Sequence, residues 1–123
     1  MDPVVAEGDG TSGTALMDDS VPLARFFKVL SDPTRVAILR LLLERERSVG
    51  EIVEILQVPQ SRVSNHMACL RWCHFVEVER ESRRAIYRIA DPRLADVLAA
   101  AGVVADDLRE CLLSCNRIGP AWI

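Results

Sequence analysis

Four cysteines are the residues of this sequence best suited to chemistry, and they occur as two pairs of equal spacing. Cys69 and Cys73 form the first pair, and Cys111 and Cys115 form the second. Side chains four residues apart on a helix share one face, with Cβ atoms about 5–6 Å apart. Choice of rotamer brings two such sulfurs to the roughly 3.8 Å that ligands of one tetrahedral ion require. Cys69 and Cys73 can therefore share one metal ion, and Cys111 and Cys115 repeat the spacing; thiolates select soft ions, namely Cd(II), Pb(II), Hg(II), As(III), Cu(I) or Zn(II).

Other roles for the cysteines stay open at this stage. They could be small buried hydrophobic residues, or redox-active thiols, although helix geometry strains a disulfide within either pair. A framework of structural disulfides is not expected, because the sequence indicates a cytoplasmic protein. Its first twenty residues hold five acidic and no basic residues, unlike a signal peptide, and no run approaches the ~20 apolar residues of a membrane span.

The first cysteine pair falls on a predicted helix that follows a short capped helix. Ser48 and Glu51 have the spacing of a capping box. The residue before Pro59 is pushed out of the helical region, so the short helix ends there and a second one begins near Gln60. Two short helices separated by a three- or four-residue turn are typical of a helix-turn-helix.

The second of these helices carries polar residues where a helix-turn-helix contacts base edges. Amide, hydroxyl and guanidinium groups suit bases and phosphates. The net charge of −3 is unfavourable for DNA, but residues 60–90 hold six arginines and three glutamates, and local charge sets the field that phosphates feel. The residues predicted to bind DNA are Gln60, Ser61, Arg62, Ser64, Asn65, His66, Arg80, Arg83 and Arg84.

The remaining sequence predicts the elements that position these residues. Ser20 is expected to cap a first helix from Val21, and Asp32 with Pro33 to start a second, which the charged residues 44–47 end in water. The alternating stretches FVEVE and AIYRI flank the polar segment RESR, which predicts a β-hairpin. A last helical region follows residues 91–92, with Gly102 as an expected break or kink.

The stretches LSDPTRVAILRLL and SVGEIVEILQVPQSRVSNHMACLRWCHFVEVERESRRAIYRIAD resemble the ArsR/SmtB family of metal-responsive bacterial repressors. The resemblance covers residues 21–100, and VSNHMACLRWCHFV is similar to the recognition helix of the cadmium/lead-sensing CmtR branch. It implies a homodimeric winged helix whose first and last helices form the dimer interface. It also implies that operator DNA is bound without metal and released when metal binds.

The resemblance further implies a third thiolate from the C-terminal region of the other subunit, for which Cys111 and Cys115 are the candidates. This sequence departs from the branch because it has two C-terminal cysteines in a different local sequence. The identity of the ion and the number of its ligands therefore stay open. Three thiolates suit Pb(II) and As(III), four suit Cd(II) or Zn(II), and Hg(II) accepts two or three.

The sequence thus predicts a mainly α protein with a β-hairpin wing: a disordered acidic tail over residues 1–19, a winged helix-turn-helix domain with dimerisation helices over 20–118, and a C-terminal tail over 119–123. We expect a repressor that a thiophilic metal releases from DNA. A thiol redox sensor on the same scaffold, or a protein-interaction module with structural zinc, are the alternatives. An enzyme is not expected, because no nucleophile–base–orienter set, phosphate loop or open metal site can be assembled.

Overall fold

The computed structural model of the protein describes residues 12–119, and the chain divides into two units between Ser31 and Asp32. The first unit contains helix α1 (Gly13–Val29), and the Ser12 side chain accepts a hydrogen bond from the Ala15 N–H at 3.0 Å. The predicted helix start at Val21 is therefore wrong. Residues 13–19, expected in the tail, belong to α1, whereas residues 1–11 of the expected tail lie outside the described residues.

Ser20 lies inside α1 and not at its end. Its hydroxyl donates to the Leu16 carbonyl at 2.8 Å, a bond back along the helix in place of a cap. Pro22 also lies inside the helix. Ser12 supplies the same capping chemistry eight residues earlier, and the helix-forming residues Ala15, Leu16 and Met17 follow it.

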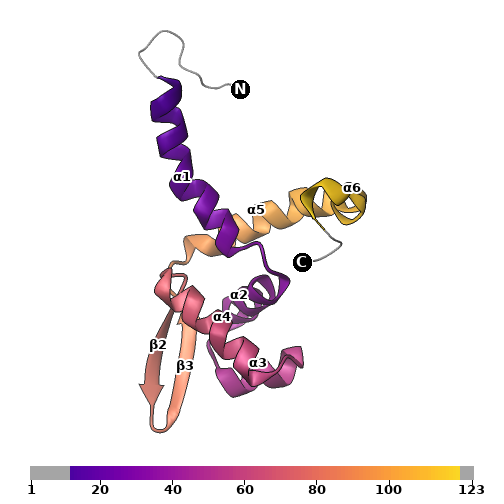
Figure 1. Cartoon of the computed structure of the whole chain (residues 1–123). Helices are drawn as coiled ribbons and strands as arrows, with labels where there is room; N and C mark the ends of the chain where they lie inside the picture. The colour runs from indigo at the N-terminus through magenta and orange to yellow at the C-terminus, as the bar shows by residue number, and fades with distance from the viewer. Residues whose placement is uncertain (1–11, 120–123) are drawn as a thin grey trace. The chain divides into compact units, whose positions relative to one another are not determined.

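The second unit carries the remaining elements (Figure 1). They are, in chain order, α2 (Pro33–Glu44), β1 (Arg47–Ser48), α3 (Val49–Leu56), α4 (Gln60–Trp72), β2 (Val76–Glu81), β3 (Arg84–Ile89), α5 (Arg93–Asp107), α6 (Arg109–Ser114) and the 3₁₀ turn η1 (Asn116–Ile118). The predicted fold class, mainly helical with a β-hairpin wing, is confirmed.

The core of this unit is built from apolar faces of α2, α3, α4 and the hairpin. Asp32 accepts hydrogen bonds from the Thr34 and Arg35 N–H groups and Pro33 occupies the first turn, so α2 begins as predicted. The buried apolar side chains are Ile38, Leu39, Leu42, Ile52, Val63, Met67, Leu70, Phe75, Val76, Ile86 and Leu94.

The connection from α2 to α3 contains a strand that the sequence did not predict. β1 pairs antiparallel with β3, Ser48 lying opposite Ile86, and the sheet order is β1-β3-β2. Arg47, expected in water, is buried: its Nε donates to the Leu41 carbonyl at 3.2 Å and its Nη2 to the Glu44 carboxylate at 2.8 Å. Because both partners lie at the end of α2, Arg47 fixes the approach of β1 to that helix.

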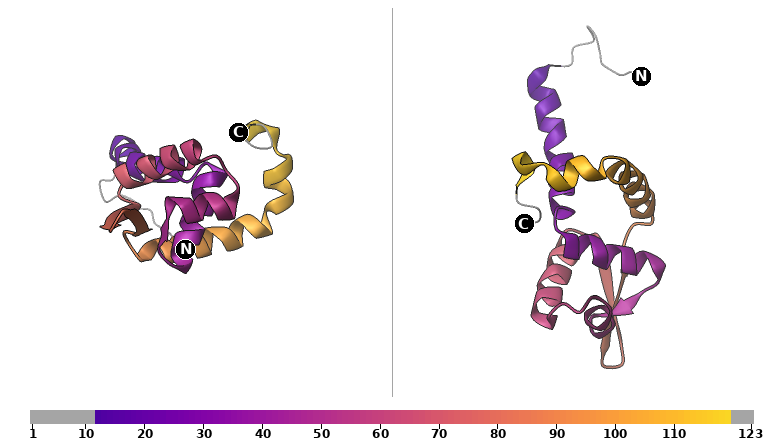
Figure 2. Two further views of the ribbon diagram at one scale, coloured as in Figure 1. Left: turned by 90° about the horizontal axis from the view of Figure 1, so that it is seen from below. Right: turned by 90° about the vertical axis from the view of Figure 1, so that its right-hand side faces the viewer.

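The predicted hairpin is present, with a shorter turn than expected. β2 and β3 pair from Val76 opposite Ile89 to Glu81 opposite Arg84, so the connection is two residues long. Ser82 opens this turn with φ of 57°, in the left-handed region. Figures 1 and 2 show the hairpin tip extending past α3 and α4.

The last helical region breaks at a different place from the one predicted. α5 continues through Gly102 and ends at Asp107, and α6 starts at Arg109 after Leu108. Of the break or kink expected at Gly102, the break is therefore wrong, since a single glycine costs a helix only about 1 kcal/mol. Apolar side chains are exposed on both helices and at the residue between them, namely Val103, Val104, Leu108, Leu112 and Leu113.

Candidate nucleic-acid interface and metal centre

Helices α3 and α4 form the predicted helix-turn-helix. Glu51 N–H donates to the Ser48 hydroxyl at 3.2 Å, and Ser48 N–H donates to the Glu51 carboxylate at 2.8 Å, which confirms the capping box. Gln57 ends α3 in the left-handed conformation, with φ of 56°. Pro59 then caps α4, so the turn spans residues 57–59.

Helix α4 separates an apolar face from a polar one, as a recognition helix requires. Val63, Met67 and Leu70 are buried against the core. Five of the residues predicted to bind DNA are exposed on the same helix: Gln60, Ser61, Arg62, Ser64 and Asn65. The polar face therefore stands clear of the core, although contact between these particular side chains and DNA stays a prediction.

His66 differs from the other predicted DNA ligands because it is half-buried and has protein partners. Its Nδ1 lies 3.3 Å from Arg35 Nη1, and a guanidinium only donates, so Nδ1 accepts. Its Nε2 lies 3.8 Å from Asp32 Oδ1, the oxygen that caps α2. His66 thus joins the recognition helix to the start of α2, and it would have to leave both partners to reach a base.

The three wing arginines, Arg80, Arg83 and Arg84, lie at the tip of the hairpin and are exposed. Arg84 also lies 3.4 Å from the Glu51 carboxylate. A fourth arginine, Arg88, sits further down the strand. Hydrogen bonds to Glu79 and Glu77 raise the pKa of its guanidinium. Arg88 of β3 therefore pairs with carboxylates of the neighbouring strand β2. The arginines at the tip are exposed to solvent.

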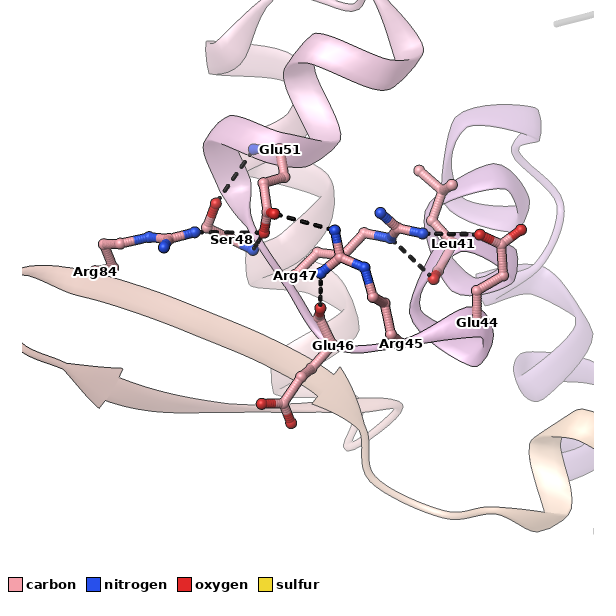
Figure 3. A network of polar contacts seen from close by, with 8 residues as sticks. All are labelled: Leu41, Glu44, Arg45, Glu46, Arg47, Ser48, Glu51 and Arg84. Carbon is pink, nitrogen blue, oxygen red and sulfur yellow. Dashed lines mark hydrogen bonds and ion pairs between the residues drawn. The ribbon is translucent and has the colours of Figure 1, made fainter.

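Sequence reasoning found the capping role of Glu51 but missed its two arginine partners. Figure 3 shows the Glu51 carboxylate between Arg84 of the wing and Arg45, which follows α2. The Arg45 guanidinium donates to Glu51 Oε2 at 3.2 Å. The hydrogen bond from Ser48 N–H, followed by that from Arg45, lowers the pKa of the Glu51 carboxyl. In the sequence, the only local indication of these ion pairs is the alternation of acidic and basic residues at positions 44–47.

The first cysteine pair lies at the C-terminal end of α4, one helical turn apart. Cys73 N–H donates to the Cys69 carbonyl at 3.0 Å, so the i to i+4 spacing is helical as predicted. Cys69 is half-buried and Cys73 is exposed. The spacing fits two thiolate ligands of one soft ion.

The chain leaves α4 through a tight cap that fixes the position of Cys73. Phe75 N–H donates to the Leu70 carbonyl at 2.9 Å, and His74 N–H donates to the Arg71 carbonyl at 3.0 Å. With His74 at φ of 64°, these two bonds form a Schellman motif. Phe75 is buried and directly precedes β2, so Cys73, the helix end and the wing are connected within three residues.

The second pair repeats the geometry on a shorter helix. Cys115 N–H donates to the Cys111 carbonyl at 2.9 Å, although Cys115 itself lies just past the end of α6. Cys111 is exposed and Cys115 is half-buried. Across residues 12–119, no three His, Cys, Asp or Glu side chains come together as metal ligands. The two pairs of one protomer therefore do not form a single cluster.

Comparison with known proteins decides the family. A family model described as bacterial regulatory protein, arsR family, matches residues 32–78. The chain is 41% identical over 95 residues to a probable mercury resistance operon repressor of Streptomyces lividans, with 77% of this chain and 76% of that protein covered. The chain belongs to the ArsR family. It is accordingly a DNA-binding transcriptional regulator with a winged helix-turn-helix, as predicted.

Further relatives are helix-turn-helix transcriptional regulators. The regulator CmtR of Mycobacterium tuberculosis is 42% identical over 76 residues, which are 62% of this chain and 64% of CmtR. The crystal structure of M. tuberculosis Rv0081 has a TM-score of 0.66 and 35% identity, covering 83% of this chain and 99% of that one.

A solution structure of a homodimeric winged helix-turn-helix domain from Mycobacterium bovis has a TM-score of 0.65 and 33% identity, covering 85% of this chain and 92% of that one. Self-association is thus observed for this structural neighbour. Among the described helices of the present chain, none has the length and apolar character to cross a bilayer.

Proposed function

We propose that this ArsR-family protein is a homodimeric repressor that binds operator DNA without metal and is released when a thiophilic metal ion binds. The observation that carries the proposal is the position of Cys69 and Cys73. Two soft ligands lie one turn apart at the end of α4, and the exposed polar residues predicted to bind DNA lie at the other end of the same helix. Metal binding at these two sulfurs therefore acts directly on α4, the helix proposed to contact the bases.

The ligand set we propose is Cys69 and Cys73 from one protomer with Cys111 and Cys115 from its partner. Exposure of Cys73 and Cys111 supports this arrangement, because both are accessible to a second chain. The separation of the two pairs within one protomer also supports it. Bound there, the ion would supply a strong link between the recognition helix of one subunit and the last helix of the other.

The release of DNA follows from that link. Pulling Cys73 towards the partner displaces the end of α4 and, through the cap at residues 73–75, the start of the wing. The two recognition helices then no longer match successive major grooves, about 34 Å apart. Metal and DNA weaken each other by the same coupling free energy, typically ~1–3 kcal/mol. Because thiolates are the ligands, metal affinity falls as pH is lowered.

Cd(II), Pb(II), Hg(II), As(III) and Zn(II) are the inducers we consider. The Streptomyces lividans relative has mercury resistance in its name, which supports Hg(II) among them. Competition between these ions for the purified protein, measured as loss of operator binding, would rank them. Ligand number would follow from the same preparation by X-ray absorption.

The test is metal titration of a labelled operator complex. We expect wild-type protein to release DNA, while Cys69→Ser and Cys73→Ser bind DNA normally and fail to release it. Ala68→Ser is the matched control, since Ala68 is an exposed neighbour on the same helix and the change also introduces a hydroxyl. Equal release by wild type and both cysteine variants would rule out the site.

A thiol redox sensor is the second candidate, because Cys73 and Cys111 are exposed. A structural neighbour, HlyU from Vibrio cholerae in its reduced state, has a TM-score of 0.63 and 27% identity. Titration under reducing, oxygen-free conditions separates the two. Metal-induced release there, with thiolate-to-metal absorption in the ultraviolet, supports the metal sensor. Release only by oxidant supports the alternative.

A further inference from the structure

The carboxylate of Glu51 holds three groups from three parts of the winged domain. Oε1 accepts the Ser48 N–H at 2.8 Å and lies 3.4 Å from Arg84 Nη2, and Oε2 accepts from Arg45 Nη2 at 3.2 Å. Figure 3 shows the two guanidinium groups approaching Glu51 from the wing and from the segment after α2. One carboxylate therefore neutralises two arginines that are distant in sequence.

Both arginines remain accessible to an anion from outside. The Arg45 side chain is 58% exposed and that of Arg84 is 60% exposed, whereas the Glu51 side chain is only 32% exposed. Exposed ion pairs contribute little to stability, so exchanging the Glu51 carboxylate for another anion costs little. A phosphate has the charge and the oxygen geometry that guanidinium groups bind best.

We propose that Glu51 is an internal competitor of the DNA backbone: a phosphate group displaces its carboxylate from Arg45 and Arg84 when the protein binds DNA. This adds Arg45 to the DNA-contacting surface and makes Glu51 the residue that restrains sequence-independent affinity. The inference rests on DNA binding, which the family establishes, and not on the proposed metal response.

The expected consequence is electrostatic. Sequence-independent affinity comes from arginines and lysines that neutralise phosphates and release counterions. In the complex with DNA, the displaced Glu51 carboxylate remains close to Arg45 and Arg84. Its negative charge therefore cancels part of their positive charge. Removing its charge should therefore raise affinity for any duplex and make binding more sensitive to salt.

Glu51→Gln is the decisive variant, because a glutamine at this position of a capping box still accepts the Ser48 N–H through its amide oxygen. Glu54→Gln is the matched control, since Glu54 is exposed on the same helix and lies outside the network. Binding is measured on a short random-sequence duplex over a range of salt concentrations, without metal. Helical circular dichroism confirms that each variant is folded.

We expect Glu51→Gln to bind roughly two- to tenfold tighter at low salt. The slope of log K against log salt should steepen by about 0.9, the value for one additional phosphate charge. Glu54→Gln should change both quantities less. Equal affinities and slopes for the two variants would overturn the proposal.

A second comparison tests whether Arg45 is involved. Arg45→Gln should weaken duplex binding more in the Glu51→Gln background than in wild type, because wild-type Arg45 must first give up the carboxylate, and this offsets part of what its phosphate contact contributes. Equal losses in both backgrounds would show that Glu51 does not compete for Arg45, and no loss in either would remove Arg45 from the DNA-contacting surface; both outcomes contradict the proposal.

A measurement on the wild type covers the case in which Glu51→Gln does not fold. The ¹³C signal of the Glu51 carboxyl should shift on adding duplex, as its arginine partners leave. A signal that stays unchanged at saturating DNA would contradict the proposal.

Discussion

Asp91 shows how a single half-buried side chain just before a helix acquires an unusual acidity. Its carboxylate accepts the Arg93 N–H at 2.9 Å and the Arg93 guanidinium at 2.7 Å, just before α5. The Arg93 side chain and then its backbone N–H lower the pKa of Asp91 from 3.8 to about 2. The negative charge is therefore retained well into the acid range.

We expect the ¹³C signal of the Asp91 carboxyl to titrate near pH 2. Because the folded pKa lies below the ordinary value, this contact stabilises the fold fully above pH 3.8 and the contribution is lost as pH falls through about 2. The free energy of unfolding of Asp91→Asn, measured as a function of pH, should lack the contribution of this contact. Titration of the wild-type group at its ordinary value would contradict the expectation.

Trp72 offers a direct readout of the proposed metal site. Its side chain is 85% exposed, and it is the last residue of α4, next to Cys73. In a Trp122→Phe chain, Trp72 is the sole tryptophan. Adding Cd(II) should change its emission as the partner's last helix covers it, and adding Cys69→Ser should abolish the change. DNA release without any change in emission would argue against this arrangement.

Two residue roles could not be predicted because they depend on partners distant in sequence. Arg47 belongs to a charged run that predicts solvent exposure, yet the carbonyl of Leu41 and the carboxylate of Glu44 make its burial favourable. His66 lies on the polar face of α4, yet its Nδ1 accepts from Arg35 and its Nε2 lies near the Asp32 carboxylate. Periodicity identifies a face but not the groups opposite it.

At the scale of elements, the helix-turn-helix depends on one side of α3. Ile52 is fully buried, whereas Ile55 on the same helix is 49% exposed. Ile52→Ala should lower the free energy of unfolding by about 2–5 kcal/mol and weaken DNA binding through loss of α3 packing. Ile55→Ala, the matched control, should cost under about 1 kcal/mol. Urea unfolding of both variants measures the difference, and similar losses would contradict the placement of α3.

Elements with strong local signals were predicted, and those without them were not. Asp32 with Pro33, the Ser48–Glu51 box and the break before Pro59 each act within a few residues, so the starts of α2, α3 and α4 were predicted correctly. β1 has only two residues and forms because β3 lies beside it. The break at Leu108 has no glycine or proline to mark it.

At the scale of the whole molecule, the exposed apolar side chains indicate self-association. Phe27 of α1 is 50% exposed and Val104 of α5 is 57% exposed, and neighbouring apolar residues on both helices are exposed as well. We expect a dimer whose thermal midpoint rises with protein concentration. Phe27→Asp and Val104→Asp should each shift the sedimentation coefficient towards that of a monomer. Ile55→Asp, which places the same charge on α3, is the control; dimers that persist in both test variants would contradict the expectation.

The candidate metal centre is only half predictable from one chain. The spacing of Cys69 and Cys73, and of Cys111 and Cys115, predicts two sulfurs per helical turn, and the structure has this geometry. Whether two turns meet depends on packing between chains, which no local pattern encodes. Residues 13–19 belong to α1 and not to the expected tail, and the rest of the division into tail, winged domain and C-terminal tail stays a prediction.

The left-handed backbone at His74 and Ser82 constrains how this protein can vary. Both positions hold residues with a Cβ where glycine would be relaxed, with φ of 64° and 57°. In a library randomised at these two codons and selected for repression, survivors should be enriched in glycine and asparagine and depleted in valine and isoleucine. Natural variation at these two positions should be limited to the same few residue types, even where neighbouring surface positions vary widely.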